Sequence, residues 1–220
     1  PTKYHYKNFI YIINHFRPKV IVCEKPVSFK FKEVEKIINY SKKKKIKFCV
    51  NFIRRSDKNF IKLKDKIKKK KEKFYGKIFY DKEFYHSCSH YINLMNFWFG
   101  KYKGHKILKI YKKNLFDSKL DVIVKFENAE IIFLNTKNKT KKEFILKSKS
   151  SNIIKYKNEG IIYNNRKFAF TMKKYQKNFY LELLRYIKNN KNYNLASSKE
   201  IMYNAKIIKN ILNRNSYGYH

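Results

Sequence analysis

The sequence predicts an α/β layer followed by an α+β layer that is built on one large sheet. In the first 52 residues, helical and strand-like segments alternate with short joints, which favours parallel strands connected by right-handed crossovers. From about residue 105 to 170, short β-rich runs follow one another, separated by Asn, Lys and Gly, as in an antiparallel sheet. Two segments with helical spacing close the chain.

Four segments predict the α/β layer. Residues 6–17 carry apolar side chains at helical spacing, and residues 19–23, "KVIVC", form an unbroken run typical of a strand buried on both faces. Residues 28–40 are predicted to form a second helix with Ser28 as its N-cap. Residues 46–52, "IKFCVNF", are predicted to form a second buried strand.

The second layer begins with helical patterns. Residues 58–72 form an amphipathic pattern, Gly76 is predicted to permit a turn, and residues 90–99 form a helix that Gly100 ends. The strand-like runs that follow are 106–111, 121–126, 129–135, 143–148, 152–157 and 160–164. The closing helices are predicted at 174–189 and 198–213, the last with Ser197 or Ser198 as its cap.

The basic composition favours no particular partner. The formal net charge is +38, which is typical of proteins that bind nucleic acid or anionic membranes. Lysine nevertheless dominates arginine and is spread over the whole length, which indicates A/T-rich codon bias more than a selected phosphate-binding face. We therefore expect no nucleic acid as partner.

The cysteines and the hydropathy indicate a cytoplasmic protein. The chain has three cysteines, without a CxxC motif or metal-ligand spacing, as expected for thiols in a reducing compartment. No apolar run approaches the ~20 residues of a membrane-spanning helix, and no secretory signal is visible. We expect no metal and no membrane.

Glu24, Lys25 and Pro26 follow the first predicted strand directly. In open α/β sheets, ligands bind beyond the carboxyl ends of the strands. A lysine held there beside a proline is suited to donate a proton or a hydrogen bond to a substrate oxygen. By themselves the three residues also suit an ordinary strand-to-helix loop.

Histidine and arginine provide two further groups of candidates. His86 and His90, in "FYHSCSHYINL", share one helix face; the pair lacks a nearby third metal ligand, but His90 could act as general acid or base. The alternative is a hydrogen-bonded structural histidine. Arg54 and Arg55 end the second strand, and we expect them at the same sheet edge as Lys25.

The order of these motifs resembles the Gfo/Idh/MocA family of NAD(P)-dependent oxidoreductases. The segments that carry the resemblance are "PTKYH", "VIVCEKPVS", "NFIRR", "GKIFY", "HSCSHYINL" and "SSKEIMYNAKIIKNIL", in the family's order. The resemblance implies the C-terminal part of a Rossmann nucleotide-binding fold, followed by a domain with a large, mostly antiparallel open sheet flanked by helices. It divides the chain into a partial Rossmann domain (1–52), a substrate and dimerisation domain (53–196) and a C-terminal helix packing back on the core (197–220).

The resemblance also assigns roles. Lys25, His90 and His86 would be catalytic, with Lys25 polarising or protonating the oxygen at the carbon that exchanges hydride. The residues expected to contact the NAD or NADP cofactor are Glu24, Lys25, Pro26, Pro1, His5, Arg54 and Arg55. For Arg54 or Arg55 the resemblance also allows contact with an anionic group of the substrate. The Lys25–Pro26 bond is a candidate for the cis form.

This sequence departs from the family in three places. His86 and Asn93 occupy positions where the family usually has Asp. No GxGxxG phosphate loop is present, and the family places that loop before its Glu-Lys-Pro triplet. We therefore expect an N-terminally incomplete Rossmann domain whose binding of NAD(P) is weak or lost.

The resulting functional hypothesis is hydride transfer between NAD(P) and a carbinol or keto carbon of a sugar or nucleotide-sugar. We also expect a homo-oligomer formed through the large sheet. Two alternatives stay open: a non-catalytic dimerisation scaffold of the same family, and a lysine-rich module that binds nucleic acid through stacked aromatic rings.

Overall fold

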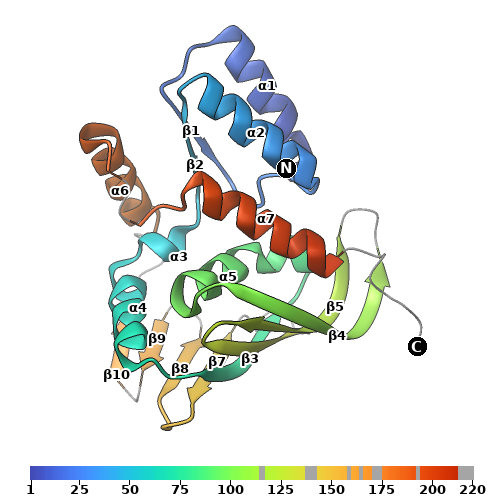
Figure 1. Ribbon diagram of the computed structural model, residues 1–220, viewed down its shortest axis with the longest axis vertical. Coiled ribbons are helices and arrows are strands. Elements are labelled where there is room, and N and C mark those ends of the chain that lie inside the picture. The colour runs from blue at the N-terminus through green and yellow to red at the C-terminus, as the bar shows by residue number, and fades with distance from the viewer. Residues whose placement is uncertain are drawn as a thin grey trace.

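The computed structural model describes residues 1–113, 117–136, 143–157, 160–163, 166–169, 175–191 and 194–212. Figure 1 shows a small parallel layer at one end of the molecule and a large sheet at the other, with helices between them. The predicted fold class is confirmed: a short parallel α/β unit precedes a mostly antiparallel sheet that is flanked by helices.

The small layer holds a two-stranded parallel sheet. Its strands are β1 (Val20–Cys23) and β2 (Lys47–Val50), with Val20 opposite Lys47 and Cys23 opposite Val50. A 3-10 turn (Thr2–Tyr4), α1 (His5–His15) and α2 (Phe31–Lys43) complete the layer.

The second helix begins later than Ser28. Helix α2 starts at Phe31, and Lys30 occupies the N-cap position. The Ser28 hydroxyl donates to the Glu33 carboxylate at 2.5 Å and accepts the Lys30 N–H at 3.1 Å. Ser28 therefore closes a turn ahead of the helix, whose first backbone hydrogen bonds run from the Glu33 and Val34 N–H groups to the Lys30 carbonyl.

The large sheet has eight strands in the order β10-β9-β8-β7-β3-β6-β5-β4. Only β3 and β6 pair in parallel; the other neighbours pair antiparallel. The strand bounds are β3 Phe74–Tyr80, β4 Tyr102–Lys113, β5 Ser118–Phe126, β6 Ala129–Asn135, β7 Phe144–Ser148, β8 Ile153–Lys157, β9 Gly160–Tyr163 and β10 Arg166–Ala169. The sequence predicts neither β3 nor β10 as a strand.

The turn predicted at Gly76 is wrong. Gly76 lies in the middle of β3, opposite Ile131 of β6 and Leu146 of β7. A Cβ at this position would collide with the Ile145 carbonyl oxygen, which explains why glycine occupies a strand interior. Glycine here permits a close approach of two strands.

Five helices surround the sheet and the joint between the layers. Their bounds are α3 Ile53–Ser56, α4 Lys58–Lys70, α5 Phe84–Phe99, α6 Tyr175–Asn189 and α7 Ser198–Leu212. Helix α5 begins six residues before the predicted start at residue 90, whereas Gly100 ends it as predicted, with a positive φ of 85°. Residue 213, predicted to end the last helix, lies outside the described residues.

Helix α5 lies at the centre of the larger core. Its buried side chains pack with those of β3, β5, β6 and β7, and the fully buried Trp98 donates from Nε1 to the Phe60 carbonyl at 3.1 Å. Helix α7 contacts both α2 and α5, so it touches the two layers (Figure 1). A second cluster joins α1, α2 and β2 to α7.

We predict that Gly76→Ala destabilises the fold. The added methyl group must push β7 away or strain β3, and overpacking of this kind costs about 1–3 kcal/mol. Urea denaturation followed by circular dichroism measures the free energy of unfolding. The control is Lys36→Ala at an exposed position of α2, where we expect a change within about 0.5 kcal/mol. Equal stability of Gly76→Ala and the wild type would contradict the close approach.

Candidate functional site

Lys25 lies beyond the carboxyl end of β1, as predicted. Its peptide bond to Pro26 is cis. Its Nζ donates a hydrogen bond to the carbonyl oxygen of His86, in the first turn of α5, at 3.2 Å. This contact joins the small parallel layer to the central helix of the large one.

Glu24 and Asn51 form a second pair at this sheet edge. The Asn51 amide donates from Nδ2 to Glu24 Oε1 at 2.7 Å, and Asn51 directly follows β2. Asn51 is buried, and its Oδ1 has no hydrogen-bond partner among the described residues. Sequence reasoning missed Asn51, although its place after the second strand was a usable signal.

His5 contacts the loop that follows β1. Its Nδ1 donates to the Pro26 carbonyl at 3.0 Å and lies 3.7 Å from Cys23 Sγ. Burial raises the pKa of the Cys23 thiol to about 12, with a smaller contribution from Glu24, so the thiol stays protonated. Pro1 precedes the 3-10 turn and is exposed.

A cavity of about 300 Å³ brings together four of the predicted residues, Lys25, Arg54, His86 and His90. The other lining residues are Phe79, Tyr80, Asp81, Lys82, Ser87 and Tyr91. The remaining predicted residues, Glu24, Pro26, Pro1, His5 and Arg55, do not line it. The cavity therefore lies at the junction of β1, α3, β3 and α5.

Asp117 holds the first turn of α5, and sequence reasoning missed it. Its carboxylate accepts the N–H groups of Tyr85 at 2.7 Å, His86 at 2.9 Å and Ser118 at 2.8 Å. The N-cap residue, Glu83, makes no side-chain cap. The residues around the start of α5 do not indicate this cap, because the capping carboxylate lies more than thirty residues further along the chain.

The two histidines differ in their surroundings. Burial, reinforced by the Lys25 and Lys82 ammonium groups, lowers the pKa of His86 below its usual value. His86 is therefore neutral at pH 7 and able to accept a proton. The His90 ring lies against the Tyr91 ring, with 4.0 Å between centroids.

Arg54 and Arg55 are neighbours with different partners. Arg54 Nη2 donates to the Tyr156 hydroxyl at 3.3 Å, and its guanidinium lies over the rings of Tyr91 and Tyr156. Arg55 is buried and does not line the cavity that contains Lys25; it lines a different one, of about 550 Å³, with residues of α5 and α7.

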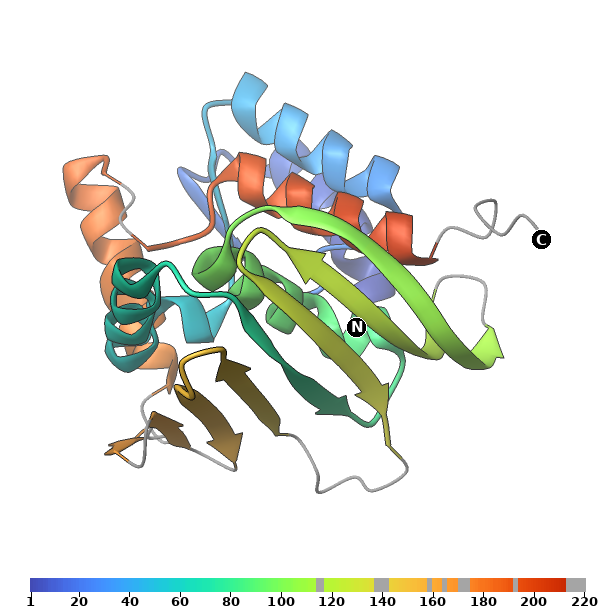
Figure 2. The same cartoon turned by 60° about the horizontal axis from the view of Figure 1, so that its bottom comes forward.

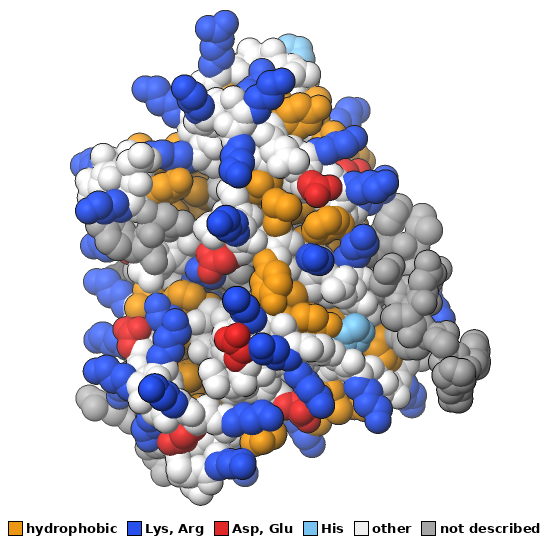
Figure 3. Space-filling model, viewed as in Figure 1, with side chains coloured by type: hydrophobic (Ala, Val, Ile, Leu, Met, Phe, Trp, Pro, Cys, Tyr) orange, Lys and Arg blue, Asp and Glu red, His pale blue; other side chains and the backbone are white. Residues whose placement is uncertain are grey.

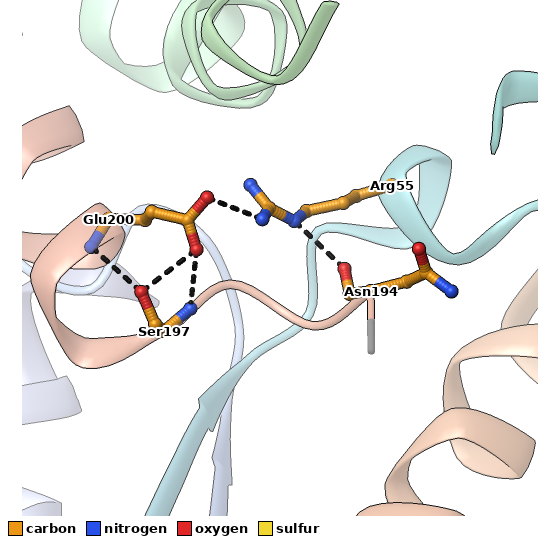
Figure 4. Close-up of polar contacts among 4 residues, drawn as sticks. All are labelled: Arg55, Asn194, Ser197 and Glu200. Atoms are coloured by element: carbon orange, nitrogen blue, oxygen red, sulfur yellow. Dashed lines mark hydrogen bonds and ion pairs between the residues drawn. The ribbon is translucent and has the colours of Figure 1, made fainter. Parts of the chain in front are cut away.

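Figure 4 shows how Arg55 ties α3 to the start of α7. Its Nη2 lies 2.5 Å from Glu200 Oε1, and its Nε donates to the Asn194 carbonyl at 2.8 Å. The other Glu200 oxygen accepts the N–H and the hydroxyl of Ser197, both at 2.9 Å, which makes Ser197 the cap of α7. Of the two predicted caps, Ser197 and Ser198, the structure has Ser197, and Ser198 is the first residue of the helix. The contacts of Arg55 are those of a structural ion pair.

The described residues contain neither a metal-binding cluster nor a helix that could span a membrane. No cluster of three or more His, Cys, Asp or Glu side chains within these residues is arranged to hold a metal ion. Over the same part of the chain, no helix is both long enough and apolar enough to cross a bilayer.

Comparison with known proteins identifies the fold. No family model and no curated protein matches the sequence. Among solved structures, an oxidoreductase from Thermotoga maritima superposes with a TM-score of 0.74 at 14% identity, over 97% of this chain and 74% of that one. A biliverdin reductase from Synechocystis, solved with biliverdin and NADP+, superposes with a TM-score of 0.70 at 12% identity, over 96% of this chain and 75% of that one.

The WlbA dehydrogenase from Thermus thermophilus, in complex with NAD and α-ketoglutarate, gives a TM-score of 0.65 at 10% identity, over 100% of this chain and 72% of that one. All three matched proteins are oxidoreductases by description. At these identities the likeness establishes the fold, which this chain shares with Rossmann-type oxidoreductases and dehydrogenases.

We predict that Asp117 makes stability fall as the pH rises from about 4 to about 6. Burial raises the pKa of its carboxyl from 3.8 to about 6, against the opposing hydrogen bonds from backbone N–H groups. The native state then binds more protons than the unfolded state, so the contribution of Asp117 is complete below the unfolded pKa and lost above the native one. The wild type should lose up to about 3 kcal/mol relative to Asp117→Asn across this interval.

Urea denaturation at several pH values measures this difference and cancels the contributions of histidines, which both proteins share. Asp65→Asn, at an exposed site on α4, is the control and should show no such trend. A wild type that gains stability relative to Asp117→Asn over the same interval would show that the helix N-terminus outweighs burial.

Proposed function

We propose that this protein is an NAD(P)-dependent oxidoreductase that acts on a carbinol or keto carbon of a sugar or nucleotide-sugar. The observation that carries the proposal is the convergence of Lys25, Arg54, His86 and His90 on one cavity beside the carboxyl end of β1. The fold shared with oxidoreductases supports it. The sugar class rests on the motif resemblance described above.

In this proposal Lys25 is the group that touches the reacting oxygen. Its ammonium group is fixed by the His86 carbonyl and can donate a further hydrogen bond into the cavity. Such a donor stabilises the charge that develops on a substrate oxygen during hydride transfer. His86, neutral at pH 7, and His90 line the same cavity and would share the proton that leaves or reaches that oxygen.

The residues at the sheet edge fit the amide end of a nicotinamide. Glu24 provides an acceptor, and the buried Asn51 Oδ1 has no donor among the described residues. When bound, the nicotinamide ring would supply or accept the hydride. Pro26, held by His5, would shape this end, and Pro1 is proposed to lie nearer the rest of the cofactor. Arg54 lines the cavity with Lys25, which favours a contact with the substrate over the predicted contact with the cofactor. For Arg55 the ion pair with Glu200 favours a supporting role.

The affinity for NAD(P) is proposed to be weak for these 220 residues taken alone. No GxGxxG motif occurs in the sequence, so no glycine-rich turn presents backbone N–H groups to a pyrophosphate. We also propose the division into 1–52, 53–196 and 197–220. It places the cavity at the boundary between the first two segments, since Lys25 comes from one and Arg54 from the other.

A homodimer formed through the open face of the large sheet is part of the proposal. In Figure 2 helix α5 lies behind the central strands, and α7 runs along the edge strand β4. The opposite face carries half-buried apolar side chains, among them Phe79, Ile123, Ile132, Leu134 and Ile145. Apolar groups on an uncovered sheet face are typical of an interface.

The observations favour neither alternative function. On the face shown in Figure 3, basic side chains are scattered among acidic and apolar ones over all visible elements, without the stripe that a nucleic-acid path requires. A scaffold without catalysis would not require Lys25, Arg54 and two histidines around one cavity.

We predict that Lys25→Ala lowers NAD(P)-dependent turnover by about a hundredfold or more, because the variant loses the donor to the substrate oxygen. Turnover is measured as the absorbance of NAD(P)H against a panel of sugars and nucleotide-sugars, at cofactor concentrations high enough to offset weak binding. The control is Lys36→Ala, an exposed position on α2 outside the cavity, which should keep wild-type turnover. Retained turnover in Lys25→Ala would refute the catalytic assignment, and saturating NADH without any turnover across the panel would favour the scaffold.

We predict that Ile132→Lys converts a dimer into a monomer. Ile132 lies opposite Ile123 and beside Lys77 on the open face, so a buried charge there would meet its own copy or Lys77 across a two-fold interface. Sedimentation velocity measures the mass of each species. The control Leu184→Lys also replaces an aliphatic side chain by lysine, at an exposed site on α6, and should leave the dimer intact. A monomeric wild type would contradict the proposed interface.

A further inference from the structure

The two adjacent arginines of α3 differ in one electrostatic respect. Arg55 has a carboxylate partner, Glu200, at 2.5 Å. Arg54 has none: in the part of the chain that the structure describes, no carboxylate lies within ion-pair distance of its guanidinium. Its Nε is buried and makes no hydrogen bond with these residues. A desolvated charge without a counter-ion is costly, which indicates that an anion completes the site.

Neutral aromatic groups hold Arg54 in place. The guanidinium carbon lies 5.2 Å from the Tyr91 ring centroid and 5.5 Å from that of Tyr156, and Nη2 donates to the Tyr156 hydroxyl. Burial raises the pKa of Tyr91 to about 12, so this phenol is uncharged at pH 7 and does not act as the counter-ion. Two aromatic contacts and one hydrogen bond fix the plane of the fork and leave other N–H groups for a ligand.

Most of the charged side chains around the cavity are basic. Arg54, Lys25 and Lys82 line it, with Asp81 as the single acidic residue among its lining side chains. An anionic group entering this space would meet a fixed fork at one point and the Lys25 ammonium group at another. A planar fork favours carboxylate or phosphate, because both accept two parallel N–H groups.

We propose that the substrate of this cavity carries an oxyanion, a carboxylate or a phosphate, that Arg54 binds. The inference rests on the proposed function, since it takes the cavity to be the substrate site, and it narrows the substrate class to acidic or phosphorylated sugars. Arg54 thereby determines specificity and positions the reacting carbon near Lys25.

Three sugars that share one scaffold test the inference: glucuronate, glucose 6-phosphate and glucose, each titrated calorimetrically at constant ionic strength without cofactor. At least one of the two anions should bind about tenfold or more tightly than glucose, since a charge-assisted fork is worth roughly one such factor. The anion that binds better identifies the source of the oxyanion. Equal affinity for all three sugars, or no saturable binding of either anion in the millimolar range, would overturn the inference.

The variants localise the effect. Arg54→Gln should abolish the preference for the anion while leaving the affinity for glucose unchanged, and Arg54→Lys should restore only part of it. Lys36→Gln removes one positive charge from the exposed face of α2 and should keep the full preference, which separates the site from the net charge of +38. If Arg54→Gln fails to fold, Tyr156→Phe is the second variant. It removes only the hydroxyl that fixes Nη2 and should lower the affinity for the anion several-fold.

The outcomes separate this inference from the proposed function. If the protein prefers anions in a way that depends on Arg54 but shows no NAD(P)-dependent turnover, the anion site is supported and the proposed oxidoreductase activity is refuted. If the protein turns over neutral sugars and the wild type and Arg54→Gln prefer anions equally, the oxidoreductase activity is supported and the proposed role of Arg54 in binding anions is refuted.

Discussion

The geometry of the site depends on the first turn of α5. A helix start leaves several backbone N–H groups without intrahelical partners, and here the turn is too buried for water to serve them all. Asp117 supplies a carboxylate to Tyr85 and His86, while Lys25 takes the carbonyl of the same His86 from the other side. One residue of α5 is thus held at both backbone groups, by the large sheet and by the small parallel layer.

This anchoring explains how two separate cores share one cavity. The cluster of α1, α2 and β2 and the cluster around α5 have few elements in common, apart from α7. Lys25 belongs to the first layer and the two histidines to the second. The distances between these side chains therefore depend on how firmly the two layers are joined. The ion pair of Arg55 and Glu200 closes that junction at a second point, because it ties α3 to the capped start of α7.

The sequence allowed prediction of what depends on neighbours along the chain. The strand "KVIVC", the charged triplet after it, the glycine that ends α5 and the Ser197 cap all have local causes, and each lies where predicted. The predicted burial of that strand on both faces is wrong, because in the described part of the chain β1 is one of only two strands in its sheet and Val22 is 38% exposed. Gly76 was misplaced because its cause is a carbonyl of β7, far away in sequence. The early start of α5 was missed for the same reason, since its cap comes from Asp117. The roles of Arg54 and Arg55 were equally hidden: both were placed at one edge, and only their surroundings distinguish them.

The excess of lysine bears on how such a site achieves selectivity. A net charge of +38 attracts every anion to the surface, but exposed charges further apart than about 10 Å are largely screened at ordinary salt. Mobile ammonium groups also pay side-chain entropy when they hold a ligand in one geometry. Arg54 escapes both limits, because two tyrosine rings fix its plane and its Nε is shielded from solvent. In a protein with this composition, selectivity among anions has to come from a group whose position is fixed, and Arg54 is such a group at the cavity that also contains Lys25.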